Sequence, residues 1–122
     1  MQETATAVYE FFGSFGIPAY DQNAVPDDAQ LPYITCYVQE PEWGRQASGY
    51  AQVWYRTKSR AMVNAKTDEI VRAIGDQGYK VKTNSGYVLI RPETPIVSPV
   101  SDDRAIGNLI NFSLNAYHMP GV

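Results

Sequence analysis

The chain is poor in the residues from which most enzyme and metal sites are built. It contains one cysteine, Cys36, and one histidine, His118, among 122 residues. A single cysteine excludes an internal disulfide and a cysteine-based metal cluster, and nucleophile systems of the Ser/His or Cys/His type need histidine together with partners. We therefore expect Cys36 to be a small buried hydrophobic residue and His118 to be a surface residue. We expect no metal and no cofactor.

Long apolar runs and an excess of basic charge are also missing. No apolar segment approaches the roughly 18 residues of a membrane span, so we expect no membrane partner. Gln2 and Glu3 follow the first methionine in place of a basic region, so no secretion signal is expected. The formal net charge is −3 and the pI is about 5.0. Proteins that bind specific nucleic-acid sequences usually carry a basic face, and this balance argues against that class.

Motifs for nucleotide binding and nucleophilic catalysis are absent as well. The sequence has no P-loop, no dinucleotide fingerprint and no nucleophile elbow. The acid pairs Asp27–Asp28 and Asp102–Asp103 lack the ligand pattern of a calcium loop, so we expect them to form turns or to be solvated charges. Nine tyrosines could stack on bases, but without accompanying lysine or arginine we place them in sheets and interfaces. The sequence therefore predicts a protein that is not an enzyme.

The charges that are present are distributed unevenly. Residues 1–58 hold seven acids and three bases, residues 59–91 hold six bases and three acids, and residues 92–122 hold three acids and one base. Such separation could let subunits or partners dock with opposite potentials facing each other. Solvated charges without a partner are the alternative, because surface charge by itself says little about binding.

Hydrophobic periodicity predicts an α+β fold. Helical spacing marks residues 3–15 and 60–74, and alternation marks strands at residues 32–39, 49–58, 79–83, 87–91 and 104–117. The last strand has the clearest alternation, with Ile110, Phe112 and Leu114 on one face. We expect residues 17–31 and 92–103 to be loops, the second because its three prolines cannot donate ladder hydrogen bonds.

These elements predict one domain over residues 1–122, in the order α-β-β-α-β-β-β. We expect an antiparallel sheet of about five strands with two helices packed on one face. The module at residues 50–75, a strand passing through Ser59 into a helix, organises this arrangement. Val53 would face the helices, leaving Tyr50, Trp54 and Arg56 on the opposite face. An exposed aromatic patch has no role in a lone domain, so it favours assembly over catalysis.

Seven residues are therefore candidates for an interface with a neighbouring molecule. Local packing within the domain is the alternative for those in the two loops. The candidates are Trp43 and Arg45 in the first long connection, Tyr50, Trp54 and Arg56 on the second strand, and Ile96 and Val97 in the proline-rich segment.

Several local motifs give the chain a family resemblance. Ile17-Pro18-Ala19-Tyr20-Asp21 and Leu31-Pro32-Tyr33-Ile34-Thr35 follow the first helix. A strand with Trp54, a helix that starts at Ser59 and contains Ala65, Asp68 and Ile70, and a hairpin that ends at Ile90 come next. Asp102-Asp103-Arg104 then leads into the long last strand. In this order the chain resembles the tail-terminator (tail-completion) proteins of long-tailed bacteriophages and prophages. It departs from them at Pro95-Ile96-Val97, where family members often have a bulkier aromatic residue.

The resemblance implies a virion structural protein that forms a ring, as a homohexamer. Such a ring caps the head-proximal end of the tail tube, binds the tail tube protein and the head-completion or adaptor protein, and lets DNA pass through its lumen without sequence-specific contact. The implied location is the virion, with assembly in the host cytoplasm. Another head–tail neck component (a head-closure or adaptor ring) and a ferredoxin-like module that binds a small molecule are the alternative functions.

Overall fold

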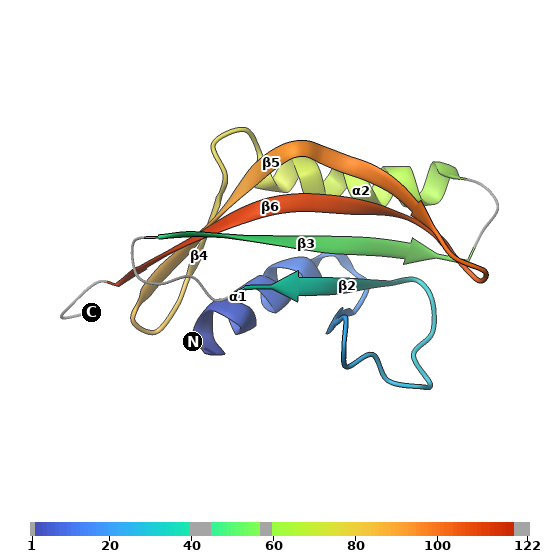
Figure 1. The fold of residues 1–122 in the computed structure, drawn as a ribbon, viewed down its shortest axis with the longest axis horizontal. Coiled ribbons are helices and arrows are strands. Elements are labelled where there is room, and N and C mark those ends of the chain that lie inside the picture. The colour runs from blue at the N-terminus through green and yellow to red at the C-terminus, as the bar shows by residue number, and fades with distance from the viewer. Residues whose placement is uncertain (1, 40–44, 57–59, 119–122) are drawn as a thin grey trace.

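The structure is a computed structural model that describes residues 2–39, 45–56 and 60–118 (Figure 1). The chain begins with helix α1 (Gln2–Phe12), a short 3₁₀ turn η1 (Gly13–Phe15) and strand β1 (Ala19–Asp21). Strands β2 (Tyr33–Val38) and β3 (Gln46–Tyr55) lead to helix α2 (Arg60–Ile74). Strands β4 (Tyr79–Lys82), β5 (Gly86–Ser101) and β6 (Ile106–His118) complete the chain.

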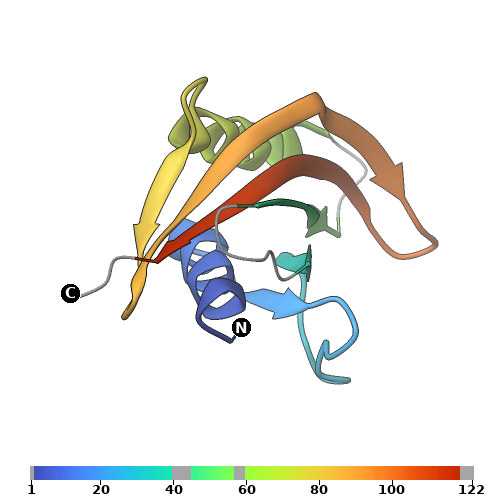
Figure 2. The ribbon, with the colours of Figure 1, turned by 60° about the vertical axis from the view of Figure 1, so that its left-hand side comes forward.

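All the strands belong to one sheet in the order β1-β2-β3-β6-β5-β4. β1 runs parallel to β2, and every other pair is antiparallel. The long strands bend, so the six-stranded sheet curls into a half-barrel (Figure 2). The prediction of a purely antiparallel sheet of about five strands with two helices packed on one face was therefore wrong. The fold is a mixed, curled sheet with two short helices.

The extra strand comes from the segment that was predicted to be a loop between residues 17 and 31. Ala19, Tyr20 and Asp21 pair in parallel with Ile34, Thr35 and Cys36. Three residues, directly after Pro18, are too few to show alternation in the sequence. Their pairing depends on a strand that lies more than a dozen residues further along the chain, so local pattern could not reveal it.

The second difference lies in the proline-rich segment, which forms the outer half of β5 and not a loop. β5 continues to Ser101 and pairs with β6, with a register shift between Pro92 and Val97. β4 pairs only with residues 87–90 of β5. Beyond that point β5 is an edge of the described sheet. Alternate N–H groups of an edge strand point away from its partner, which is where a sheet tolerates proline.

The predicted core alternation of β6 is confirmed. Ile110, Phe112 and Leu114 are completely buried, and the Phe112 ring packs against the ring of Phe12 in α1 with centroids 5.3 Å apart. Helix α2, predicted at residues 60–74 and found there, adds its buried side chains to the same core. The α2 residues are Val63, Thr67, Ile70 and Ile74.

One polar residue lies on the core side of β6. Asn108 is 4% exposed, and its Nδ2 group donates to Asn64 Oδ1 and Thr67 Oγ1, each at 3.0 Å. Arg60 donates to the Asn108 side-chain oxygen and, at 2.7 Å, to the Gly107 carbonyl. A buried amide is tolerated when its donors and acceptor are paired. This network therefore fixes the position of α2 on the sheet.

Candidate functional site

The sheet face opposite the core carries aromatic and amide side chains on its first three strands, and we call it the outer face. Antiparallel pairing places three residues of β2 directly beside three of β3, and β1 adds Tyr20. Tyr37 is 36% exposed and its ring stacks on that of Tyr50, with centroids 5.3 Å apart. The outer face consists of Tyr20, Tyr33, Thr35, Tyr37, Tyr50, Gln52 and Trp54.

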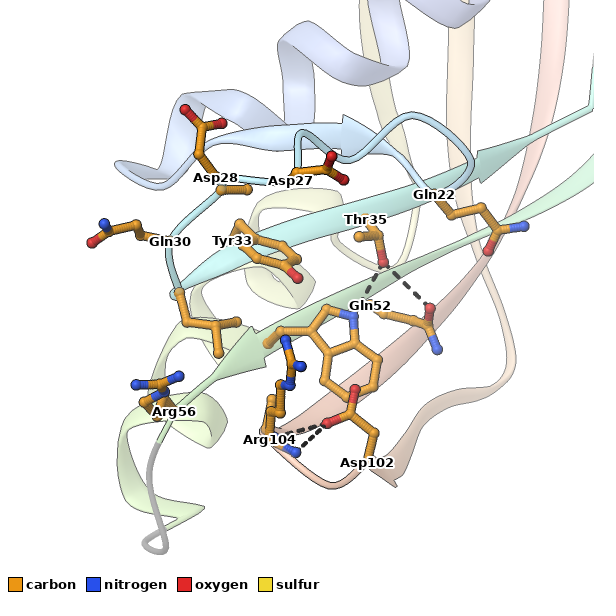
Figure 3. Close-up of a pocket in the computed structure, with 14 residues that line it drawn as sticks. Gln22, Asp27, Asp28, Gln30, Tyr33, Thr35, Gln52, Arg56, Asp102 and Arg104 are labelled. Carbon is orange, nitrogen blue, oxygen red and sulfur yellow. Dashed lines mark hydrogen bonds between the residues drawn. The ribbon is translucent and has the colours of Figure 1, made fainter.

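A pocket of about 960 Å³ opens at one end of the outer face (Figure 3). Its floor is formed by β2 and β3. One wall is the segment of residues 22–31 and the other is the turn of residues 102–105 between β5 and β6. Its lining residues are Gln22, Asp27, Asp28, Ala29, Gln30, Leu31, Tyr33, Thr35, Gln52, Trp54, Arg56, Asp102, Arg104 and Ala105.

Hydrogen bonds hold the floor of the pocket in place. Trp54 Nε1 donates to Thr35 Oγ1 at 3.2 Å, and Thr35 Oγ1 donates to Gln52 Oε1 at 3.3 Å (Figure 3). This chain fixes the plane of the indole ring. Gln52 Nε2 has no hydrogen-bond partner among the described residues, so a donor remains available to a molecule in the pocket.

Both walls are also held by local hydrogen bonds. The Tyr50 hydroxyl donates to Gln22 Oε1 at 2.7 Å and ties the start of the first wall to β3. Asp102 Oδ1 accepts from the N–H groups of Arg104 and Ala105, both at 2.8 Å, and shapes the second wall. This is the turn chemistry expected of an aspartate at that position. The walls are therefore pre-formed.

The pocket carries opposite charges on its two rims. Arg56 and Arg104 lie on one side of Tyr33, with Asp102 next to Arg104, while Asp27 and Asp28 lie on the other side (Figure 3). Arg56, Arg104, Asp27 and Asp28 are exposed. Within the described residues, none of these four side chains has a hydrogen bond or an ion pair. A guanidinium recognises carboxylate groups, and a carboxylate recognises ammonium groups.

The six predicted interface residues that the structure describes divide into three groups. The structure brings Trp54 and Arg56 together in the pocket, and Tyr50 holds its wall. Arg45 is exposed just before β3, at the far end of that strand from Trp54. In β5, Ile96 is partly buried against the core, and Val97 lies opposite Ile110 of β6. Trp43 lies outside the described residues.

Sequence reasoning did not select most of the pocket residues. Tyr33 and Thr35 lie within a strand predicted at residues 32–39, but their position beside Trp54 depends on the register of β2 with β3. Asp27, Asp28 and Asp102 were predicted in turns, and turns are confirmed at both places. The segments of residues 22–31 and 102–105 lie far apart in the sequence, and only the fold places them around one cavity.

The thiol of Cys36 is buried, as predicted. Its exposed fraction is 1%. Burial, helped by the negative charge of Asp21, raises the pKa of Cys36 from 9.0 to about 12. The thiol therefore stays protonated near neutral pH and is not a nucleophile. In the described part of the chain, no group of three or more His, Cys, Asp and Glu side chains is placed to hold a metal ion.

Neither α1 nor α2 is both long enough and apolar enough to cross a membrane.

The chain matches no protein-family model, and a search of the curated proteins finds no match. Function is therefore inferred from the outer face and the pocket.

Proposed function

We propose that this protein is a non-enzymatic structural subunit of a phage virion: a tail terminator that forms a homohexameric ring, caps the tail tube and joins it to the head-completion proteins. The aromatic outer face is the observation that carries this proposal. Five of its seven members are tyrosine or tryptophan. These are the residue types enriched in the energetically dominant parts of protein interfaces.

The arrangement of the outer face suits contact with a folded neighbour. Tyr37 and Tyr50 form a rigid stacked pair, and Tyr20 packs edge-on against Tyr33 with centroids 5.7 Å apart. Aromatic side chains that are already ordered lose little conformational entropy on binding. A partner that covers them gains apolar contact area without reorganising the sheet.

A ring also requires that each subunit present two different surfaces. The turn between β5 and β6, which forms one wall of the pocket, lies at one end of the long axis, while β4 lies towards the other end (Figure 1). The resemblance to tail terminators agrees with such a head-to-tail subunit. In this proposal the tail tube protein and the head-completion protein bind the two faces of the ring, and DNA passes through the lumen. The acidic net charge of −3 disfavours tight retention of DNA.

The proposal is tested by the size and shape of the assembled protein. Light scattering across a concentration series should show growth from monomer to hexamer, and electron micrographs should show rings. Antibodies against the protein should label the head-proximal end of purified tails. Labelling at the head vertex instead would favour a head-closure or adaptor ring. A protein that stays monomeric and is missing from purified tails would rule out both neck assignments.

A pair of single variants connects this test to the outer face. Tyr37→Asp places an unpaired charge on the stacked pair and should prevent ring formation without unfolding the domain. Met62→Asp is the matched control, because Met62 is a 60% exposed apolar residue on α2. Ring formation that is equal in the two variants would remove the outer face from the interface.

A small-molecule-binding module is the second candidate function, and the pocket is the observation in its favour. Its volume of about 960 Å³ falls within the range of about 300–1,000 Å³ found for ligand sites. Such sites are lined mainly by apolar side chains, whereas this one is lined mainly by charged and amide groups. A metabolite that raises the unfolding temperature in proportion to its concentration would support this candidate over the first.

A further inference from the structure

The pocket has a complementary surface on the same chain. We infer that it binds a second copy of this protein, and that the segment bound is the turn of residues 75–78 together with β4. This inference rests on the proposed ring and identifies the two surfaces that would meet in it. Three observations carry it: the unpaired charges of the pocket, the charges of the turn and strand, and their positions on the fold.

The pocket offers two kinds of binding group that its own residues do not satisfy. Arg56 and Arg104 form a cationic rim, and Asp27 and Asp28 form an anionic rim. The Nε2 amides of Gln22 and Gln52 also line the pocket and have no hydrogen-bond partner within the described residues. A matching segment must carry an acid and a base some distance apart, together with backbone carbonyls that can accept from the amides.

The turn before β4 and β4 itself provide this pattern. Gly75 and Gly78 have φ of 71° and 88°, a conformation natural to glycine, and they form a turn that leaves Asp76 exposed. Lys80 and Lys82 follow on β4, where both are exposed. Alternate residues of a strand point to opposite faces, so the two lysines share one face about 6.6–6.8 Å apart along the strand. The acid thus precedes two bases within seven residues.

The backbone of β4 is available as well. β4 is the last strand of the sheet and pairs on one side with β5. No described strand pairs with its other side, which therefore presents carbonyl and N–H groups of the kind that commonly become contact points between chains. Lys80 Nζ lies 4.3 Å from the centre of the Tyr87 ring, a contact that orders this lysine before it binds.

The two surfaces match in sign and in position. With Asp76 directed to Arg56 and Arg104, the lysines of β4 would face Asp27 and Asp28, and the β4 carbonyls would face the glutamine amides. The pocket lies over β2 and β3, whereas β4 is the edge strand at the other end of the sheet, beyond β6 and β5. A contact between them is head-to-tail, which is the type of contact that closes a ring.

Charge reversal tests this contact. The variant Asp27→Lys/Asp28→Lys reverses the anionic rim, and Lys80→Glu/Lys82→Glu reverses β4. Each variant alone brings like charges together and should raise the concentration for half-maximal ring assembly at least about tenfold. An equimolar mixture of the two restores opposite charges at every contact, and assembly should return to within about threefold of the native value. Circular dichroism confirms that each variant is folded.

The matched control for Asp27→Lys/Asp28→Lys is Glu10→Lys/Asp68→Lys, which makes the same change in net charge at exposed positions of α1 and α2. It should assemble like the native protein. If native rings form and the reversed variants form them equally well, this inference is overturned while the proposed function stands. Loss of assembly without rescue in the mixture shows that these surfaces bind something other than each other, such as an adaptor protein, and also overturns it. A native protein that never assembles overturns both.

Discussion

Asn108 and Thr67 meet where β6 crosses under α2: Asn108 Nδ2 lies 3.0 Å from Thr67 Oγ1. The Thr67 hydroxyl in turn donates to the Val63 carbonyl at 2.7 Å. Both side chains are buried, at 4% and 2% exposure, within a strand and a helix whose other inward residues are apolar. A single polar contact of this kind permits one position of the helix on the strand, because any shift would leave buried groups unpaired.

Replacing Asn108 by leucine should therefore destabilise the protein. Leucine removes the acceptor for Arg60 and the donors to Asn64 and Thr67, and we expect the free energy of unfolding to fall by about 1–3 kcal/mol. Urea unfolding followed by tryptophan fluorescence measures the change. Asn64→Ala is the control, since Asn64 is exposed and its loss should cost less than about 1 kcal/mol. An Asn108→Leu protein as stable as the native one would show that apolar packing alone positions α2.

The elements that sequence predicted are those whose pattern repeats over many residues. Helix α2 and the core face of β6 each show a periodic apolar pattern over more than ten residues, and both were located within about two residues. β1 has three residues, and the outer half of β5 contains prolines that normally exclude a strand. β1 exists because it pairs with β2, 15 residues further along the chain, and the outer half of β5 exists because it pairs with β6. The local pattern of neither segment records this pairing.

The pocket could be predicted only in part, for a related reason. Trp54 and Arg56 were identified from alternation along β3, and their place in the pocket agrees with that interpretation. Arg104 and Asp27 lie 77 residues apart in the sequence. The first was predicted at the start of the last strand and the second in a turn. Their approach to one cavity follows from the curl of the sheet, which depends on the whole strand order.

The close approach of Gly49 to Phe112 leads to a second stability prediction. A Cβ atom on Gly49 would lie 2.6 Å from Phe112 Cε1 and 2.8 Å from the Tyr37 carbonyl oxygen. The ring cannot move freely, because it also packs on Phe12. Gly49→Ala should therefore lower the free energy of unfolding by about 1–3 kcal/mol, the usual effect of overpacking a core.

Gly13→Ala is the control for this experiment. A Cβ atom at Gly13 would meet its nearest neighbour, Ala19 Cβ, at 4.0 Å, and Gly13 has no positive φ. The substitution should leave stability unchanged or raise it by up to about 1 kcal/mol. Equal effects of the two alanines in urea unfolding would contradict the proposed clash at Gly49.

The raised pKa of Cys36 predicts a specific dependence of stability on pH. The unfolded chain releases the thiol proton near pH 9.0, while the folded chain retains it until about pH 12. Above pH 9 the unfolded state binds fewer protons, so the free energy of unfolding falls as pH rises. The contribution of the protonated thiol is complete below pH 9 and disappears towards pH 12, with a slope of at most about 1.4 kcal/mol per pH unit.

Comparison with Cys36→Ala isolates this effect from every other contribution to the dependence of stability on pH. The native protein should exceed the variant in stability at pH 8 by a larger margin than at pH 10, as measured by urea unfolding at both values. The thiol of the native protein should also stay unreactive towards a disulfide reagent at pH 8 until urea unfolds the chain. Stability curves that run parallel from pH 8 to pH 10 would show that Cys36 titrates normally in the fold.

The hydrogen bond from Tyr50 to Gln22 gives the last prediction, because it couples the outer face to the pocket. Tyr50→Phe removes the hydroxyl that reaches Gln22 Oε1 at 2.7 Å but keeps the ring on Tyr37. We expect a loss of about 0.5–1.5 kcal/mol in stability and faster amide hydrogen exchange in residues 22–31, where the Ala24 and Ala29 N–H groups bond to nearby carbonyls. Tyr20→Phe is the control, since within the described residues the Tyr20 hydroxyl makes no hydrogen bond.

Because a loosened wall no longer holds Asp27 and Asp28 in place, ring assembly should weaken in Tyr50→Phe and not in Tyr20→Phe. Unchanged exchange in both proteins would mean that the wall is held by its own turns, independently of β3.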